Sequence, residues 1–374
     1  MTNPIFRVNH HIFQGKIAML SIWNAALEEF QADRDFVLAS ILNAQGSSPR
    51  HVGTRFLVRR DGSIVGTIGG GLFEAEVQRS AATVLESGTS YRAAFSFRGK
   101  DHTSSQMICG GDADVLLEFV AAKDKMMEEI VRRLVTMSTH RTTGYLFTHV
   151  SIQPGDRVPG SLDHLLVEEN GARAGRIAGE EAALKSVPER RLLKPSQMLE
   201  VEGLEYLFFL EWVRPRGTAY IFGGGHVGAC VAHLASYVNF RVVVLDDREE
   251  FASTDRIPDA DEAIVLKSFQ DAFANLTIDE DSYVVIVTRG HSHDRLTLAQ
   301  ALETDAGYIG VIGSKRKHNI VFKALLGEGF TVKDIERVHA PIGIPIGGET
   351  PEEIGVSIVA QMIQVRNGKE RLTW

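Results

Sequence analysis

The sequence predicts an α/β protein with a mixed α+β domain at the N-terminus and a doubly wound parallel sheet at the C-terminus. Its 374 residues are more than one ordinary hydrophobic core accommodates. The Arg-Pro-Arg-Gly segment over Arg214–Gly217 has the composition of a domain junction. After it, short apolar strands alternate with helical segments, which is typical of parallel sheets. We therefore expect domains over residues 1–213 and 214–374.

The first half predicts helices and strands without regular alternation. Apolar residues at helical spacing predict helices over Ile17–Phe30 and Met126–Met137. Strands are expected over Phe36–Asn43, Asp114–Val120 and Gly144–Val150. Between two β-like runs, Asp61-Gly62 predicts a type I′ hairpin turn, and Asn170-Gly171 predicts a second hairpin.

In the second half, five apolar runs have the length and composition of buried strands. They are Thr218–Phe222, Arg241–Leu245, Ala263–Lys267, Tyr283–Thr288 and Tyr308–Ile312. Helical segments separate them, so a parallel sheet with helices on both faces is predicted. The last helix is expected to begin at Thr350, with Pro351 in its first turn and Glu353 completing a capping box.

Composition excludes several classes of partner. The net charge of −8 and the pI near 5.9 argue against nucleic acid or an anionic membrane as the main partner. Only two cysteines are present, Cys109 and Cys230, so no disulfide framework is expected. No apolar run reaches the roughly 18 residues of a spanning helix, and no signal peptide is recognised. We expect a cytoplasmic protein.

A glycine motif follows the first strand of the predicted parallel sheet. Gly223, Gly225 and Gly228 have the spacing G-x-G-x-x-G, with His226 at the start of the following helix. The next strand ends in Asp246, near the spacing of about 20 residues expected for an acid at a ribose hydroxyl. Bare glycine backbone lets a phosphate approach the helix N-terminus, where unpaired N–H groups favour an anion. The order of these elements predicts a Rossmann-like domain.

Two other loops follow strands of the same sheet. One carries Arg289, His291, His293 and Asp294, so a cation, two imidazoles and a carboxylate lie at one strand end. A structural or substrate-contact role is more plausible here than a metal site, because His-x-His-Asp is a loose pattern for ligands. The other loop places Ser314 and Lys315 at a helix start, which indicates either a phosphate-bearing ligand or a solvated basic surface.

The N-terminal half offers candidates of the same kind. Gly69-Gly70-Gly71 leads into a helix, so it predicts either a second anion site or a connection that needs positive φ. Ser48 and Arg50 suit a phosphate or a polar heterocycle, in what is otherwise an ordinary loop. Cys109 is either a reactive thiolate or a buried small apolar residue.

Together these motifs resemble the XdhC/CoxI (CoxF) family, accessory proteins for xanthine and carbon monoxide dehydrogenases. The matching segments run in one order along most of the chain. They are GSSPRHVGTRFLV (46–58), GTIGGGLFEAEV (66–77), ICGG (108–111), IFGGGHVG (221–228), TRGHSHD (288–294) and YIGVIGSKRK (308–317). The pattern departs at Gln106, where glycine is expected, and over Arg141–Arg214.

The resemblance implies a protein that binds the molybdenum cofactor (molybdopterin), protects it during sulfuration by a cysteine desulfurase, and delivers it to a molybdenum hydroxylase. It also implies that Cys109 contacts molybdenum or its sulfido group, since thiolate is a soft ligand. The cofactor-binding set it implies is Ser48, Arg50, Gly69, Gly70, Gly71, Gly223, Gly225, His226, Gly228, Asp246, Arg289, Ser314 and Lys315.

Three functions remain as alternatives. The leading hypothesis is a maturation factor that acts by binding and hand-over rather than by turnover. A homo-oligomer is compatible with it, because cofactor sites often lie between domains or subunits. The second is an NAD(P)-dependent oxidoreductase, with His291, His293 and Asp294 as the candidates for acid or base. The acid pair Asp246-Asp247 favours NAD over NADP if a dinucleotide binds, and Arg248 leaves this open. The third, an interaction scaffold, leaves the polar loops without a role.

Overall fold

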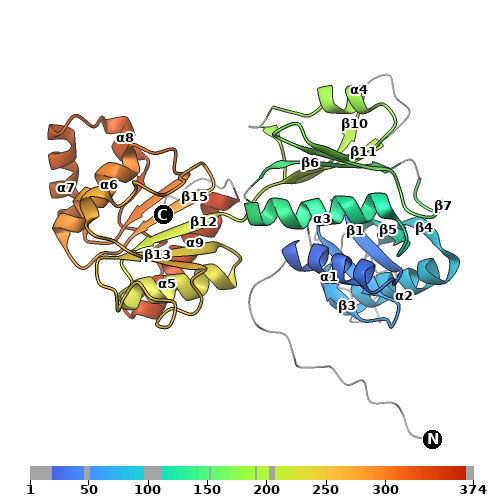
Figure 1. Ribbon diagram of the computed structural model, residues 1–374, viewed down its shortest axis with the longest axis horizontal. Coiled ribbons are helices and arrows are strands. Elements are labelled where there is room, and N and C mark those ends of the chain that lie inside the picture. Colours follow the sequence, from blue (N-terminus) through green and yellow to red (C-terminus); the bar gives the residue numbers. More distant parts are fainter. Residues whose placement is uncertain are drawn as a thin grey trace, which may run out of the picture. The chain divides into compact units, whose positions relative to one another are not determined.

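The computed structural model describes residues 19–45, 51–96, 112–140, 142–150, 153–189, 192–201 and 207–367. Two compact units divide the chain between Pro215 and Arg216. Figure 1 labels their elements. Each unit has its own sheets and its own core, so each is described separately.

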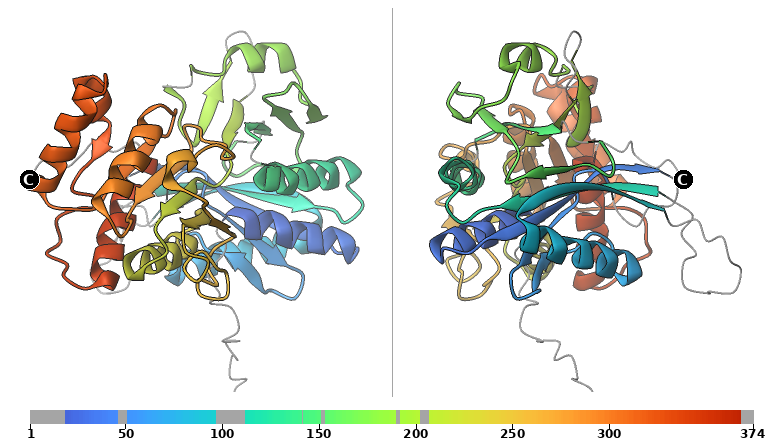
Figure 2. Two further views of the ribbon diagram at one scale, coloured as in Figure 1. Left: turned by 60° about the vertical axis from the view of Figure 1, so that its left-hand side comes forward. Right: turned by 90° about the vertical axis from the view of Figure 1, so that its right-hand side faces the viewer.

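A six-stranded antiparallel sheet forms the first layer of the N-terminal unit. Its order is β3-β2-β1-β5-β4-β7. The strands are β1 (Phe36–Gln45), β2 (Arg55–Arg59), β3 (Ile64–Gly66), β4 (Thr89–Ser96), β5 (Asp112–Val120) and β7 (Arg157–Pro159). Helix α2 (Gly71–Ser87) covers one face, and α1 (Met19–Gln31) and α3 (Lys125–His140) cover the other (Figure 2). Because β1 is covered on both faces, its sequence is a nearly continuous apolar run.

A second antiparallel sheet completes this unit. Its order is β10-β11-β6-β8-β9. The strands are β6 (Gly144–Val150), β8 (His164–Glu168), β9 (Arg173–Gly175), β10 (Ser196–Glu200) and β11 (Leu207–Val213), and the short helix α4 covers Glu180–Lys185. Helix α3 joins the two sheets, because Ile130 and Leu134 lie in one core with Leu146 and Leu166. The predicted mixed α+β architecture is thereby confirmed.

One turn differs from its prediction. Strands β2 and β3 form the expected hairpin, but only Gly62 of the Asp61-Gly62 pair has positive φ, at 80°. The predicted type I′ turn is therefore wrong, since that turn needs positive φ at both positions. The Asp61 carboxylate instead accepts a hydrogen bond from the Ser63 N–H at 2.9 Å. This local bond lets Asp61 keep negative φ, which avoids the steric cost of a Cβ in the left-handed region.

The C-terminal unit is a doubly wound parallel sheet, as predicted. Its order is β14-β13-β12-β15-β16-β17. The strands are β12 (Thr218–Phe222), β13 (Arg241–Asp246), β14 (Glu262–Val265), β15 (Ser282–Ile286), β16 (Tyr308–Val311) and β17 (Val338–His339). Helices α5 (His226–Tyr237) and α9 (Pro351–Arg366) pack on one face, while α6 (His291–Leu302) and α7 (Lys315–Gly327) pack on the other; α8 covers Val332–Glu336 (Figure 1).

The strand order of this unit reverses direction at β12. Strand β12 pairs with β13 on one side and with β15 on the other, so the connections leave it in opposite directions. In such sheets the crevice lies at the carboxyl ends of the strands, at this reversal.

The predicted capping box at the start of α9 is confirmed: Thr350 accepts from the Glu353 N–H, and Glu353 accepts from the Thr350 N–H.

Within the ranges described above, no helix combines the length and the apolar character needed to cross a bilayer.

A buried ion pair lies between the two sheets of the N-terminal unit. His164 Nε2 is 2.6 Å from Glu118 Oε1, and both side chains are about 95% buried. Thr148 Oγ1 lies 3.1 Å from His164 Nδ1, and a second buried pair, Arg55–Glu211, is close enough to act on the imidazole. Burial by itself lowers the pKa of His164, but the charge and hydrogen bond of Glu118 outweigh it and raise that pKa.

We predict that this pair makes the stability of the unit depend on pH. Because the pKa of His164 is higher in the folded chain, protonation stabilises the fold below the unfolded pKa of about 6.5. This contribution is lost as the pH rises through the folded pKa. His164→Gln should therefore cost about 3–5 kcal/mol at acidic pH and clearly less at alkaline pH, measured by urea denaturation. His233→Gln, in an exposed pair with Asp259, is the control and should change little at either pH. A cost for His164→Gln that is independent of pH would contradict the prediction.

Candidate functional site

The glycine loop after β12 is shaped by three different constraints. Gly223 has φ of 113°, a value that side chains rarely adopt, and its N–H donates to the Leu245 carbonyl at 2.7 Å. A Cβ on Gly228 would lie 1.8 Å from the Gly223 carbonyl oxygen, so α5 crosses the strand end with no space for a methyl group. A Cβ on Gly224 would lie 2.0 Å from the Phe251 carbonyl oxygen. Gly224 and Gly228 therefore have no space for a side chain, and Gly223 has a backbone conformation that favours glycine.

Gly225 is the exception in this loop. It is the N-cap of α5, and a Cβ built on it meets no atom within 4 Å. The neighbouring His226 is exposed at the first position of the helix. The first N–H groups of a helix carry partial positive charge and attract anions. An open N-cap glycine beside a tight turn is the arrangement that lets a phosphate approach the backbone.

Asp246 closes the loop from the side of β13. Its side chain is 97% buried and accepts hydrogen bonds from the Gly224 N–H and the Arg248 N–H, at 3.0 and 3.1 Å. The Arg248 guanidinium adds two more, from Nε at 2.9 Å and from Nη2 at 3.0 Å. Burial raises the pKa of Asp246, but the bonds from Arg248 and Gly224 outweigh it and hold the pKa below its usual range. A ribose contact by Asp246 remains a prediction, and it would require these bonds to change.

The loop after β15 contributes a cation and a buried carboxylate. Arg289 Nη2 donates to Asp247 Oδ2 at 2.8 Å, which joins this loop to the end of β13. Asp294 is fully buried in the first turn of α6 and accepts from Thr288 Oγ1 at 2.5 Å. Its other oxygen accepts from Lys317 Nζ at 2.7 Å. Asp294 is therefore held between the loops that follow β15 and β16.

The other predicted residues of these two loops are His293, Ser314 and Lys315. The His293 ring packs on Phe269, with centroids 4.5 Å apart. Ser314 is the N-cap of α7 and accepts from the Lys317 N–H at 3.3 Å, while Lys315 is exposed. Thr288 and Lys317 both donate to the predicted site residue Asp294, and the sequence analysis named neither of them as a candidate. Lys317 is one of several cations in the segment GSKRK (313–317), and no spacing in the sequence identified Asp294 as its partner.

His318 lies beside this ion pair. It is 97% buried. Burial lowers the pKa of His318, with the positive charge of Lys317 acting in the same direction and a backbone hydrogen bond at Ile312 opposing it. These surroundings favour the neutral form of the imidazole over the charged form.

In the N-terminal unit, the loop Gly69-Gly70-Gly71 enters helix α2 with all three residues at positive φ, between 64° and 137°. The predicted need for positive φ is thus confirmed. A carboxylate of the chain already lies at this loop: Glu74 Oε2 accepts from Thr67 Oγ1 at 2.5 Å and from the Ile68 and Gly70 N–H groups at 3.1 and 3.2 Å. An external anion here would compete with Glu74, and the anion role stays a prediction.

Three predicted site residues, Ser48, Arg50 and Cys109, lie outside the described residues. Cys230 is half-buried on α5, and a Cβ on Gly355 of α9 would lie 3.1 Å from its Cβ. Burial raises the pKa of the Cys230 thiol, which fits a packing role. The described ranges contain no group of three His, Cys, Asp or Glu side chains placed to hold a metal ion.

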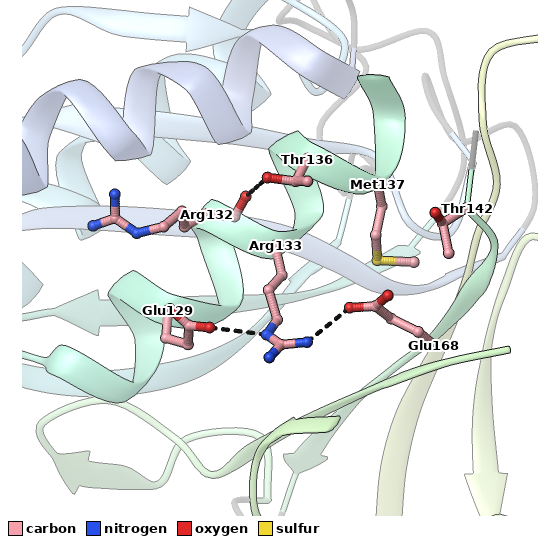
Figure 3. A pocket seen from close by; sticks show the side chains of 7 residues that line it. All are labelled: Glu129, Arg132, Arg133, Thr136, Met137, Thr142 and Glu168. Atoms are coloured by element: carbon pink, nitrogen blue, oxygen red, sulfur yellow. Dashed lines mark hydrogen bonds and ion pairs between the residues drawn. The ribbon is translucent and has the colours of Figure 1, made fainter. Parts of the chain in front are cut away.

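Figure 3 shows a pocket of about 300 Å³ on the N-terminal unit. None of the predicted site residues lines it. Its lining is Glu129, Arg132, Arg133, Thr136, Met137, Thr142 and Glu168. Arg133 donates to both Glu129 and Glu168 at 2.9 Å, so the central charges of this pocket neutralise one another. The pocket therefore lacks the unmatched charge that a phosphate-bearing ligand requires.

A parallel sheet with a glycine loop at its point of reversal defines a protein with a Rossmann-type domain. Family models identify which one: "XdhC Rossmann domain" matches residues 219–362, and "XdhC and CoxI family" matches residues 30–96. The chain belongs to the XdhC/CoxI family.

Relatives and a solved structure are similar over most of the chain. YqeB of Escherichia coli K12, described as uncharacterized, is 26% identical over 93% of this chain, which spans about half (47%) of YqeB. A probable xanthine dehydrogenase subunit of Bacillus subtilis 168 is 25% identical over 92% of this chain and 96% of its own. PaoD of E. coli K12, a molybdenum cofactor insertion chaperone, is 21% identical over 99% and 97%. A crystal structure described as a xanthine dehydrogenase from Bacillus halodurans is 26% identical and covers 94% of this chain and 98% of that one, with a TM-score of 0.74.

The glycines of the motif should respond differently to alanine. Gly228→Ala forces a methyl group against the Gly223 carbonyl and should destabilise the protein by about 1–3 kcal/mol or more. Gly225→Ala meets open space at φ of −67° and should stay within about 1 kcal/mol of the wild type. Thermal unfolding of both variants checks this order, and equal losses would show that the loop has a different geometry.

Proposed function

We propose that this protein is an accessory factor that binds the molybdenum cofactor and delivers its sulfurated form to a molybdenum hydroxylase of the xanthine or carbon monoxide dehydrogenase type. The observation that carries the proposal is the glycine loop: it is closed around Gly223 and Gly228 and open at Gly225. Membership of the XdhC/CoxI family supports the same function. So do the names of two relatives, a molybdenum cofactor insertion chaperone and a probable xanthine dehydrogenase subunit.

In this proposal the cofactor is cargo, and its phosphate end binds at the N-terminus of α5. The Gly225 backbone and the exposed His226 receive the phosphate, because the helix end supplies N–H donors and partial positive charge. Arg289, Ser314 and Lys315 follow the neighbouring strands and add cationic and hydroxyl groups at the same sheet edge. Gly223 and Gly228 act by shaping the loop.

The N-terminal unit holds the other residues that the proposal assigns to the cofactor. Cys109 is the proposed thiolate contact to molybdenum or its sulfido group, with Ser48, Arg50 and the loop Gly69–Gly71 as further cofactor contacts. The proposed partners are the apo form of the hydroxylase and a cysteine desulfurase, and the proposed location is the cytoplasm. Binding and hand-over require no turnover, so a chaperone is proposed rather than an enzyme.

An NAD(P)-dependent oxidoreductase is the second candidate, favoured by the G-x-G-x-x-G loop and the acid at the end of β13. His293 and Asp294, two of its candidates for acid or base, make contacts within the fold. Asp294 is fully buried between Thr288 and Lys317, and His293 packs on Phe269. Hydride chemistry by either of these two groups would require it to reach a substrate, and His291 is the third candidate for the acid or base.

We predict that purified protein retains molybdenum cofactor stoichiometrically and activates a cofactor-free hydroxylase. Gly225→Glu places a carboxylate where the phosphate binds and should abolish both properties through charge repulsion. Gly327→Glu, at the last residue of α7, where a Cβ meets no atom within 4 Å and φ is not positive, controls for added charge and should retain cofactor. Cofactor content, hydroxylase activation and NADH formation are measured together. Substrate-dependent NADH formation without cofactor retention would establish the oxidoreductase instead.

We also predict that Cys109→Ala binds cofactor but fails to deliver its sulfurated form, because the soft thiolate ligand is lost. The measurement is hydroxylase activation after loading with sulfurated cofactor. Cys230→Ala is the matched control, since the Cys230 thiol packs between helices. Normal delivery by Cys109→Ala would show that this cysteine has no role in transfer.

A further inference from the structure

Asp246 has no acceptor site left for a ribose. An ionised carboxylate offers about four lone-pair sites. Here Oδ1 accepts from the Arg248 N–H and from Arg248 Nε, while Oδ2 accepts from the Gly224 N–H and from Arg248 Nη2. The side chain is also 97% buried. In dinucleotide-binding proteins the corresponding acid accepts a hydrogen bond from the ribose hydroxyl. This chain has the acid of the motif, but the acceptor positions of its carboxylate are already used by Arg248 and Gly224.

Arg248 engages both carboxylate oxygens of Asp246, which are the atoms that would accept from a ribose hydroxyl. Its guanidinium lies 3.6 Å from the centroid of the Phe251 ring, and its Nη2 shares the acceptor Oδ2 with the Gly224 N–H. The Phe251 carbonyl packs on Gly224 as well. Arg248 is therefore fixed against the glycine loop by an ion pair on one side and by an aromatic ring on the other.

The same guanidinium still has donors for an anion. An arginine side chain carries five N–H donors, and Asp246 takes two of those on Arg248. The side chain is 27% exposed. Gly225, one residue beyond the Gly224 N–H, has open space at the start of α5. A phosphate at this loop would meet helix N–H groups and a fixed guanidinium together, which is a strong arrangement for anions.

We propose that Arg248 is a specificity-determining residue of the glycine loop: it excludes a ribose diol from Asp246 and selects a ligand that presents a phosphate without one. Asp246 is then a positioning residue that holds Arg248 and Gly224. The inference rests on the proposed function only in taking this loop as the phosphate site. It names the ligand class by chemistry: a phosphorylated group whose neighbouring moiety makes no demand on Asp246.

The test compares the affinities of inorganic pyrophosphate and NADH by isothermal titration calorimetry. Wild-type protein should bind pyrophosphate and bind NADH weakly. Arg248→Ala should raise the NADH-to-pyrophosphate affinity ratio at least about tenfold, the factor of one charge-assisted hydrogen bond, because acceptor sites of Asp246 open while a cation is lost. A role limited to stability would weaken both ligands alike and leave the ratio unchanged.

Two further variants sharpen the result. Arg256→Ala is the matched control, since Arg256 lies 4.3 Å from the centroid of the same Phe251 ring, and its affinity ratio should equal that of the wild type. Arg248→Gln retains one donor toward Asp246, so the buried carboxylate keeps part of its hydrogen bonding. This variant should still raise the NADH-to-pyrophosphate affinity ratio. Thermal unfolding identifies which variants are folded.

Tight NADH binding by the wild type, or an unchanged ratio in a folded Arg248 variant, overturns the inference. Neither result bears on cofactor delivery, which is measured by hydroxylase activation. Conversely, the ratio can change as expected in a protein that delivers no cofactor. The two proposals therefore fail separately.

Discussion

The close approach of helix α5 to strand β12 is the constraint on which the candidate site depends. With a Cβ on Gly228 only 1.8 Å from the Gly223 carbonyl oxygen, the helix must begin directly at the end of the strand. The N–H groups of its first turn are thereby brought to the carboxyl edge of the sheet. Asp246 fixes the same loop from β13 through the Gly224 N–H. The position of Gly225 follows from these two contacts, since the chain on either side of it is immobilised.

Ion pairs between loops keep this edge in one arrangement. Asp247–Arg289 connects the loops after β13 and β15, and Asp294–Lys317 connects α6 to α7. The second pair is nearly fully buried at Asp294, where desolvation offsets much of the attraction between the charges. A pair of this kind contributes little net stability. Its effect is to specify geometry, because a displaced partner leaves a buried charge uncompensated.

The regular elements of the C-terminal unit followed from the sequence, and the pairing of its side chains did not. Thr218–Phe222 was predicted with its observed bounds, since a buried parallel strand is a continuous apolar run bounded by glycines. The two-residue strand β17 was missed because Val338–His339 is too short for any periodicity. Asp246 was identified by spacing, yet its engagement by Arg248 depends on a side-chain conformation that spacing does not encode.

The N-terminal unit shows the same division. Gly69-Gly70-Gly71 indicated a strand-to-helix connection, because three positive φ values in succession require glycine. Nothing in the sequence indicated that Glu74 would turn back and occupy its N–H groups. Strands β10 and β11 were not predicted, although β11 is largely buried, because they lie in the segment over Arg141–Arg214 that departs from the family pattern. Strand β4, which lies between α2 and β5, was not predicted either.

The charges at this sheet edge suit the binding of a ligand better than a chemical reaction of it. A general acid must donate a proton to the substrate and a general base must accept one, and either works best with a pKa near the working pH. The bonds from Arg248 and Gly224 lower the pKa of Asp246, and burial lowers the pKa of His318, so the first shift favours the ionised carboxylate and the second the neutral imidazole. Arg248 and Lys317 are committed to carboxylates while retaining further donors. Such an edge offers an anion fixed positive charge and pre-positioned donors. That property fits the proposed function, in which the protein holds a phosphorylated cofactor until a partner takes it.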